Sequence, residues 1–212
     1  MKTNLTKDSG FTLIELLTVI AIIGILAAII IPTVGSVRTS ANKSKTRVQF
    51  SQWAASADLF KADYGFYPRL TSGNTVASGA LDTTTFLANL TGRTYTGAIV
   101  TDAERKDNKR KLSFYSVSDK ELLKDSAGAA TNQLVDAFTN SNINVMIDAN
   151  GDGFISGGEL ITTGIKGGNA VDGLEATTYT PVASSFPTQI RAGVAFYSPG
   201  KATSANDYVY SW

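Results

Sequence analysis

One stretch of 21 residues limits what this chain can fold into more than any other feature. Residues Phe11 to Ile31 contain a single charged side chain, Glu15, and no polar stripe. As a helix rising about 1.5 Å per residue, the stretch would be roughly 31 Å long, which matches the hydrocarbon thickness of a bilayer. It is too long for the apolar part of an ordinary secretory signal peptide, and no small-residue cleavage site follows it. The pattern therefore predicts a membrane-spanning helix over residues 11–31 rather than a buried helix of a soluble protein.

The residues at the start of this stretch form a specific pattern. A polar leader, residues 1–10, ends in Gly10, and the sequence Phe-Thr-Leu-Ile-Glu runs from Phe11 to Glu15. This junction resembles the prepilin signal of type IV pilins and type II secretion pseudopilins. The resemblance implies cleavage after Gly10 by a prepilin peptidase and methylation of the new N-terminal Phe11. It also implies a structural subunit that an inner-membrane assembly platform builds into a filament, together with copies of itself and other pilin-like subunits.

Glu15 is the only charge in the apolar stretch and needs a partner. A carboxylate deep in a bilayer costs roughly 2.5–3.5 kcal/mol on insertion scales. Glu15 lies four residues after Phe11, about 6 Å further along a helix. Its side chain could reach back to the membrane surface, or it could neutralise the N-terminal amine of a neighbouring subunit, which would fix the axial register between helices. The resemblance favours the second role.

The direction of insertion rests on the resemblance. It implies a single-pass protein of the bacterial inner membrane, in contact with lipid, with its head in the periplasm before it enters a pseudopilus or pilus. Four basic residues follow the apolar stretch between positions 38 and 47, against two before it. The simple positive-inside count would place the head in the cytoplasm, but we give the specific junction more weight than the count.

Helical periodicity continues beyond Pro32, which closes the apolar stretch. Proline lacks a backbone donor and kinks a helix. Pilins and pseudopilins have a proline at this place, so the resemblance implies that Pro32, like Glu15, matters for assembly. Residues 32–64 form the predicted amphipathic half of one long helix, and Gly65 followed by Pro68 predicts its end. The periodic apolar positions are Trp53, Ala57, Phe60 and Tyr64.

Residues 65–212 are predicted to form a head with strands and little helix. Apolar or β-branched runs bounded by polar residues predict three strands, at Leu112–Val117, Ile143–Ile147 and Gly193–Tyr197. A short helix is expected around Thr84–Leu90. The mixed-charge run at 104–111 is read as a solvated loop, with a contact for an acidic partner as the lesser alternative. The expected fold is thus α+β, the pilin fold, with a long N-terminal helix on a small antiparallel sheet.

Residues 148–159 match the calcium-loop pattern D-x-[DN]-x-[DN]-G-x5-E in full. Calcium prefers six to eight oxygen ligands, and residues at alternate positions can supply them while Gly153 allows the sharp turn. Gly157 and Gly158 discourage an exiting helix, so a loop-only site is expected, with a structural calcium ion. A turn rich in Asp, Asn and Gly without metal is the simpler alternative. The expected ligands are Asp148, Asn150, Asp152, the Phe154 carbonyl, Ser156 and Glu159.

Composition bears on the class of function. The chain has no histidine and no cysteine, which removes the commonest general base and two common metal ligands. Its net charge of +1 gives no reason to expect a nucleic-acid partner. We therefore expect a structural protein and not an enzyme. The alternatives are a membrane-tethered, calcium-dependent binding module that does not polymerise and, less favoured, an enzyme on a pilin-like stem, for which no nucleophile–base spacing is visible.

Overall fold

The structure is a computed structural model, and it describes residues 11–104, 106–160, 165–166, 178–179, 187–201 and 207–212. Gly10 and the rest of the predicted leader lie outside the described residues. The chain divides into two compact units, residues 1–41 and residues 42–212. The division falls inside the long helix.

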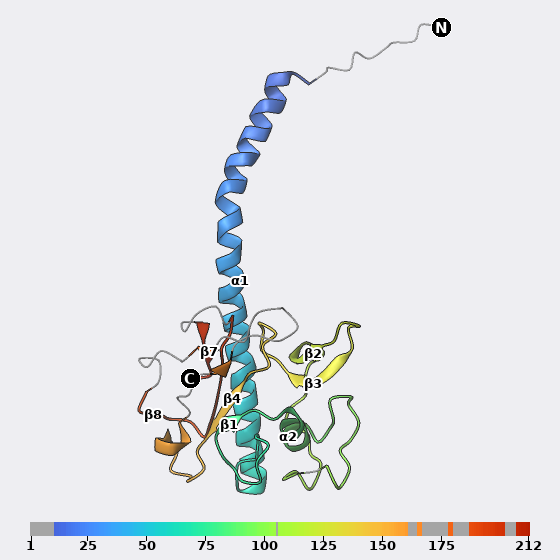
Figure 1. The fold of residues 1–212 in the computed structure, drawn as a ribbon, viewed down its shortest axis with the longest axis vertical. Helices are drawn as coiled ribbons and strands as arrows, with labels where there is room; N and C mark the ends of the chain where they lie inside the picture. The colour runs from blue at the N-terminus through green and yellow to red at the C-terminus, as the bar shows by residue number, and fades with distance from the viewer. Residues whose placement is uncertain (1–10, 105, 161–164, 167–177, 180–186, 202–206) are drawn as a thin grey trace, which may run out of the picture. The chain divides into compact units, whose positions relative to one another are not determined.

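Helix α1 runs from Leu13 to Tyr64 and passes through residue 32 without a break (Figure 1). Within the first unit it carries the apolar stretch, and it is the one helix among the described residues that is long and apolar enough to cross a membrane. The helix ends where the sequence predicted. Gly65 takes the left-handed conformation with φ +85°, and its N–H donates to the Lys61 carbonyl at 2.7 Å, which is a common way for glycine to close a helix.

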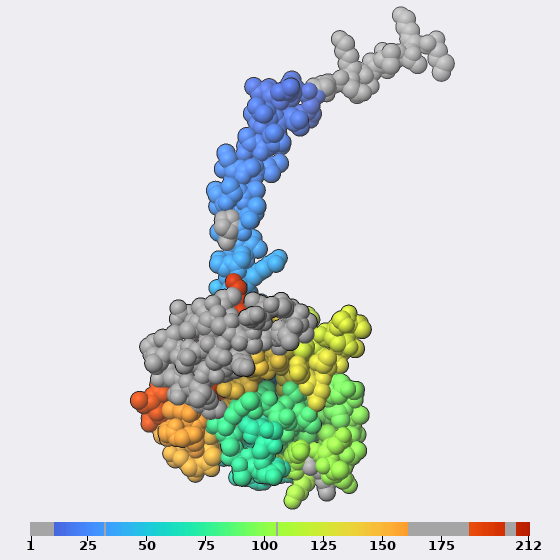
Figure 2. Space-filling model, in the orientation of Figure 1, coloured from blue at the N-terminus to red at the C-terminus, as the bar shows by residue number. Residues whose placement is uncertain are grey.

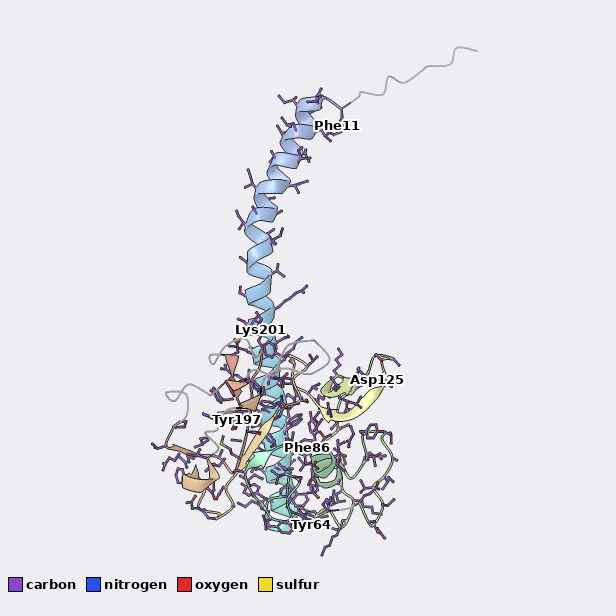
Figure 3. The ribbon with its side chains drawn as sticks, in the orientation of Figure 1. Phe11, Tyr64, Phe86, Asp125, Tyr197 and Lys201 are labelled. Carbon is purple, nitrogen blue, oxygen red and sulfur yellow. The ribbon has the colours of Figure 1, made fainter. Side chains whose placement is uncertain are left out.

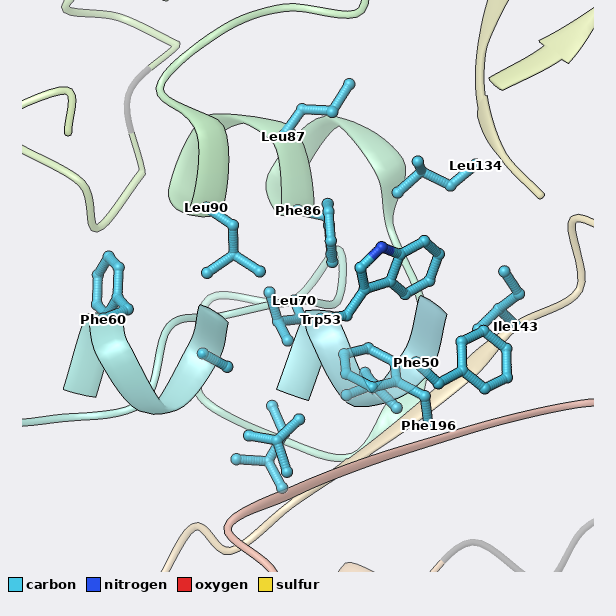
Figure 4. Packing of buried hydrophobic residues seen from close by; sticks show 14 of the residues in the cluster. Phe50, Trp53, Phe60, Leu70, Phe86, Leu87, Leu90, Leu134, Ile143 and Phe196 are labelled. Atoms are coloured by element: carbon cyan, nitrogen blue, oxygen red, sulfur yellow. The ribbon is translucent and has the colours of Figure 1, made fainter. Parts of the chain in front are cut away.

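In the second unit, α1 supplies the centre of the hydrophobic core. Trp53 is fully buried, and its ring centroid lies 5.4 Å from that of Phe50, 4.9 Å from Phe86 and 5.5 Å from Phe196 (Figure 4). These rings come from α1, from the short helix α2 and from a central strand. The aromatic cluster therefore joins three parts of the head that are distant in sequence, and tilted ring pairs at such distances add stability beyond their buried area.

The main sheet has four antiparallel strands in the order β1-β4-β9-β10. Central strands β4 and β9 pair with Val145 opposite Phe196, and every residue of both strands is buried. One face packs on the cluster around Trp53, and the other packs on a smaller cluster around Tyr197, a residue labelled in Figure 3. Because both faces are covered, the centres of these strands, Val145–Ile147 and Val194–Phe196, are apolar without alternation. The strands are β1 (Gly79–Ala80), β4 (Asn144–Ile147), β9 (Val194–Ser198) and β10 (Val209–Tyr210).

The remaining elements are short and flank this sheet. Within the part of the chain that the structure describes, three other strand pairs occur, and all are antiparallel. They are β2 (Leu122–Lys124) with β3 (Ala130–Leu134), β5 (Ile155–Ser156) with β8 (Gln189–Ile190), and β6 (Ile165–Lys166) with β7 (Thr178–Tyr179). The short helices are α2 (Thr83–Phe86), the π-helical turn Leu87–Thr91, and single 3₁₀ turns at Asp119–Glu121 and Gly157–Glu159.

The α+β class is confirmed, and so are two of the three predicted strands and the helix expected around 84–90. The strand predicted at Leu112–Val117 is wrong. The N–H groups of Phe114 and Tyr115 both donate to the Leu90 carbonyl, at 2.8 and 2.9 Å, and the Asn108 side chain binds both the N–H and the carbonyl of Leu112. The backbone is therefore satisfied by a side chain and a helix end instead of a strand partner.

Candidate assembly segment and calcium loop

The predicted membrane segment exposes all of its large apolar side chains. From Phe11 to Ile31 the large apolar side chains are between 47% and 82% exposed (Figure 2, blue). Isolated apolar residues are normal on a protein surface, but a continuous apolar surface of this length marks contact with a membrane or with other chains. The first unit thus presents a surface suited to lipid and to neighbouring apolar helices.

Glu15 is hydrogen-bonded within its own helix. Its Oε2 accepts from the Thr12 N–H at 2.9 Å and from the Thr12 hydroxyl at 2.7 Å, and the Glu15 N–H donates to Thr12 Oγ1 at 3.3 Å. This reciprocal pattern is a capping box, which satisfies donors at the first turn of a helix. Sequence reasoning overlooked Thr12, although the spacing Thr-x-x-Glu was visible in the sequence.

The cap leaves part of the Glu15 carboxylate available. All of the hydrogen bonds to the carboxylate within the described residues use Oε2, and Oε1 accepts none of them. The structure brings Phe11 and Glu15 to the same end of α1. Oε1 could therefore accept a further donor without loss of the cap. Pro32, the other residue predicted to matter for assembly, lies inside α1.

The predicted calcium loop begins at Asp148, which is buried, with 2% of its surface exposed. Asp148 Oδ1 accepts from the Gly151 N–H at 2.6 Å and from the Asp152 N–H at 3.2 Å, and Oδ2 accepts from the Gly153 N–H at 3.0 Å. Gly151 and Gly153 have φ +78° and +88°, which L-residues other than Asn and Asp rarely adopt. The glycines therefore allow the chain to wrap around the Asp148 carboxylate.

The far end of the loop turns back to its start. Glu159 Oε1 accepts from the N–H groups of Ala149 and Asn150 at 2.9 and 3.2 Å, and its Oε2 accepts from the Ser156 N–H at 3.1 Å. The first and last residues of the pattern are thus drawn to the same end of the loop. Between them, Asp152 Oδ1 accepts from the Phe154 N–H at 2.8 Å.

The structure places the predicted calcium ligands on one loop, but it does not arrange their carboxylates around a common point. Within the described residues, no three acidic side chains are grouped closely enough to hold a metal ion. The carboxylates of Asp148 and Glu159 are instead occupied by backbone N–H groups. The backbone N–H groups of the loop thus find their acceptors within the loop itself. Asn150 and Asp152 remain exposed to solvent.

The loop is anchored to the head at its first residue. The Asp148 N–H donates to the Gly193 carbonyl at 2.9 Å, just before β9. Next to it, residues 148–151 share a cavity of about 180 Å³ with the end of α1 and Tyr67. The Tyr67 hydroxyl donates to Asp58 at 3.1 Å, and burial, followed by the nearby Asp58, raises the pKa of Tyr67 to about 12. Tyr67 is therefore a neutral hydrogen-bond donor at physiological pH.

Comparisons with known proteins address the N-terminal segment. The family model described as the prokaryotic N-terminal methylation motif matches residues 5–31. The chain carries the prepilin-type motif at its N-terminus. The resemblance seen in Gly10 to Glu15 is thereby confirmed for that part of the chain, which is pilin-like.

Relatives point to the same group of proteins. Over 67 residues the chain is 39% identical to type II secretion system core protein G of Pseudomonas aeruginosa and 34% identical to the protein of the same name from Escherichia coli K12. The corresponding protein of Vibrio cholerae is 31% identical over the same length. Each match covers 32% of this chain and 46–47% of the relative, so the chain spans less than half the length of these relatives. No solved structure matches the chain.

Proposed function

We propose that the chain is a structural subunit of a type II secretion pseudopilus or a related type IV pilus-like filament. A prepilin peptidase would remove residues 1–10, and an inner-membrane platform would draw the mature chain from the bilayer into the filament. The single observation that carries this proposal is the methylation motif at residues 5–31, together with an apolar stretch whose large side chains, from Phe11 to Ile31, are all exposed. The head would lie on the periplasmic side of the membrane.

The first test is the N-terminus of the protein when the full-length chain is produced together with a prepilin peptidase and an assembly platform. We expect mass spectrometry of the membrane fraction to find a chain that begins at methylated Phe11, and sheared filaments to contain the same chain. A chain that keeps Met1 and never polymerises would contradict the proposal.

Glu15 has two roles that substitutions can separate. Glu15→Gln keeps an oxygen that can accept from Thr12 and so keeps the capping box, but it removes the negative charge. Thr12→Ala removes the cap and keeps the charge. If Glu15 neutralises the amine of Phe11 in a neighbouring subunit, Glu15→Gln will insert into the membrane and fail to assemble, whereas Thr12→Ala will still assemble. Assembly by Glu15→Gln at the wild-type level would refute the pairing.

We also propose that residues 148–159 bind a structural calcium ion. The donor set suits calcium because the side chains of the pattern offer only oxygen and amide groups, and the two ends of the loop already meet through Glu159. Asp148, Asn150, Asp152, Ser156, Glu159 and the Phe154 carbonyl would hold the ion. A bound cation would offset the repulsion among three carboxylates in twelve residues and brace the loop against the start of β9.

The calcium proposal can be tested on residues 42–212 by calorimetry and thermal unfolding. Calcium at millimolar concentration is expected to bind once and to raise the unfolding temperature, and Asp152→Ala is expected to abolish both effects. Asp125→Ala is the matched control, because Asp125 also accepts from the N–H two residues ahead of it, at 2.9 Å, but belongs to no calcium pattern. No binding by the wild-type protein, or equal losses in the two variants, would remove the proposal.

A further inference from the structure

Asn150 is the one asparagine in the sequence that is followed directly by a glycine. The backbone nitrogen of a residue can attack the side-chain carbonyl carbon of a preceding asparagine, and a side chain on the attacking residue hinders that approach. Glycine has no side chain, so the nitrogen of Gly151 is open to the reaction. Asn150 and Gly151 are both exposed, which also gives water access to the pair.

The Asn150 side chain is folded toward the nitrogen that would attack it. Its Oδ1 accepts from the Asp152 N–H at 2.8 Å. The ring that this hydrogen bond closes contains Cγ of Asn150, the nitrogen of Gly151 and the three atoms that join them covalently. These five atoms are the ones that form the ring of a succinimide. A side chain already held in this bent conformation has less freedom to lose before it reacts.

The two hydrogen bonds of the Asn150 carboxamide also affect its reactivity. When Cγ is attacked, negative charge develops on Oδ1, and the Asp152 N–H already points at that oxygen and stabilises the charge. On the other side of the group, Nδ2 donates to Asp152 Oδ2 at 3.2 Å. Backbone and side chain of Asp152 therefore hold both polar atoms of the carboxamide, so that it cannot turn freely away from Gly151.

The attacking nitrogen is hydrogen-bonded to a carboxylate. The Gly151 N–H donates to Asp148 Oδ1 at 2.6 Å. A hydrogen bond to a charged acceptor polarises its donor and increases the electron density on the nitrogen. Asp148 is buried and also accepts from the N–H groups of Asp152 and Gly153, which fixes its position. The fold thus holds both reaction partners, the nitrogen of Gly151 and Cγ of Asn150, in one small loop.

We infer that Asn150 and Gly151 form a self-modifying site, at which the folded loop promotes conversion of its own asparagine to aspartate and isoaspartate. The nitrogen of Gly151 forms a bond to Cγ of Asn150, and the bond from Cγ to Nδ2 breaks. The proton that Gly151 loses passes through solvent to the departing nitrogen, which leaves as ammonia. Water then opens the succinimide. Breaking the new bond to Cγ gives aspartate, and breaking the original peptide bond gives isoaspartate.

Both products change the loop. Each replaces the neutral amide of Asn150 with a negative charge on an exposed part of the head. In isoaspartate the chain also runs through the former side chain, which adds a backbone atom before Gly151 and shifts the N–H groups that bind Asp148. The conversion therefore alters the charge and the hydrogen bonds of the loop as the protein ages. It needs no metal and no assembly, so it does not depend on the proposed filament or calcium site.

The test compares the folded full-length chain, in detergent, with the same chain unfolded in guanidinium chloride. Both samples contain a chelator and are kept at mildly alkaline pH, then digested at acidic pH, where the reaction is slow. Mass spectrometry measures replacement of the amide at residue 150 by an acid, and an isoaspartate-specific methyltransferase identifies the isomer. A synthetic peptide of residues 144–156, kept in both solvents, corrects for the effect of the denaturant.

We expect conversion at Asn150 to be at least about threefold faster in the folded chain, because the fold holds the reacting atoms together. The two chains differ only in their folding, so a corrected rate that is equal or slower in the folded chain would overturn the inference.

Two comparisons test whether the reaction belongs to this site. Asn74 is the internal control, since it is equally exposed in a loop but is followed by the β-branched Thr75, and it is expected to keep its amide. Gly151→Ala places a methyl group beside the attacking nitrogen, and no heavy atom lies within 4 Å of the new Cβ. This variant is expected to convert more slowly than wild type. Equal rates at Asn74 and Asn150, or in Gly151→Ala and wild type, would also overturn the inference.

Discussion

Asp136 provides the most specific prediction about the head, because it is a carboxylate buried in a network of hydrogen bonds. It is 3% exposed. Its Oδ1 accepts from the N–H groups of Phe138 and Asn140 at 2.8 and 2.9 Å, and its Oδ2 accepts from the Ser198 hydroxyl at 2.7 Å. The hydrogen bonds favour the charged form, but burial outweighs them and raises the pKa of Asp136 from 3.8 to about 6.

The sign of the resulting pH dependence follows from linkage. In the unfolded chain Asp136 ionises near its ordinary pKa, so between about pH 4 and pH 6 the folded protein holds a proton that the unfolded chain has lost. The free energy of unfolding therefore falls as the pH rises through this window. The difference between 3.8 and about 6 corresponds to about 3 kcal/mol, which is the full loss expected above pH 6.

Asp136→Asn tests this reasoning with almost no change in shape. The amide oxygen can still accept from both backbone N–H groups, and the Ser198 hydroxyl can rotate to accept from the amide nitrogen. In urea unfolding of residues 42–212, the free energy of unfolding of the variant should rise relative to that of wild type between pH 4 and pH 7, by up to about 3 kcal/mol. Asp125→Asn, at an exposed turn, should follow the wild-type curve. If the free energies of unfolding of Asp136→Asn and wild type differ by the same amount at every pH, the proposed role of Asp136 is refuted.

Three further substitutions address packing and capping, and urea unfolding of the same unit measures each. Trp53→Ala should cost about 3–5 kcal/mol because it empties the centre of the core, whereas Leu59→Ala, at a residue 57% exposed, should cost less than about 1 kcal/mol. Gly193→Ala should cost about 1–3 kcal/mol, since the new Cβ would lie 1.5 Å from the Tyr67 hydroxyl; a cost that persists after Tyr67→Leu would count against that clash. Asp82→Ala should cost about 1 kcal/mol by uncapping α2, and Asp82→Asn, which can still cap, should not.

The sequence by itself determined the features that depend on neighbouring residues. The apolar stretch, the motif around Phe11 and Glu15, and the end of α1 at Gly65 are all local patterns, and the structure and comparisons bear them out. The two central strands were also visible, because burial on both faces leaves a continuous apolar run. The calcium pattern belongs to the same local class, and its metal remains a prediction.

Tertiary structure decided what depends on residues far apart in the chain. The failure at Leu112–Val117 came from Asn108 and the Leu90 carbonyl, which satisfied the backbone in place of a strand partner. The hydrogen bond from Ser198 to Asp136 joins residues 62 positions apart, and the sequence around Asp136 does not predict it. The face that α1 buries has the same origin. Periodicity shows that α1 can pack, but only the folded head shows that Phe50, Trp53 and Phe60 are covered while Val48 and Leu59 stay exposed, because burial depends on the strands and loops that pack against the helix.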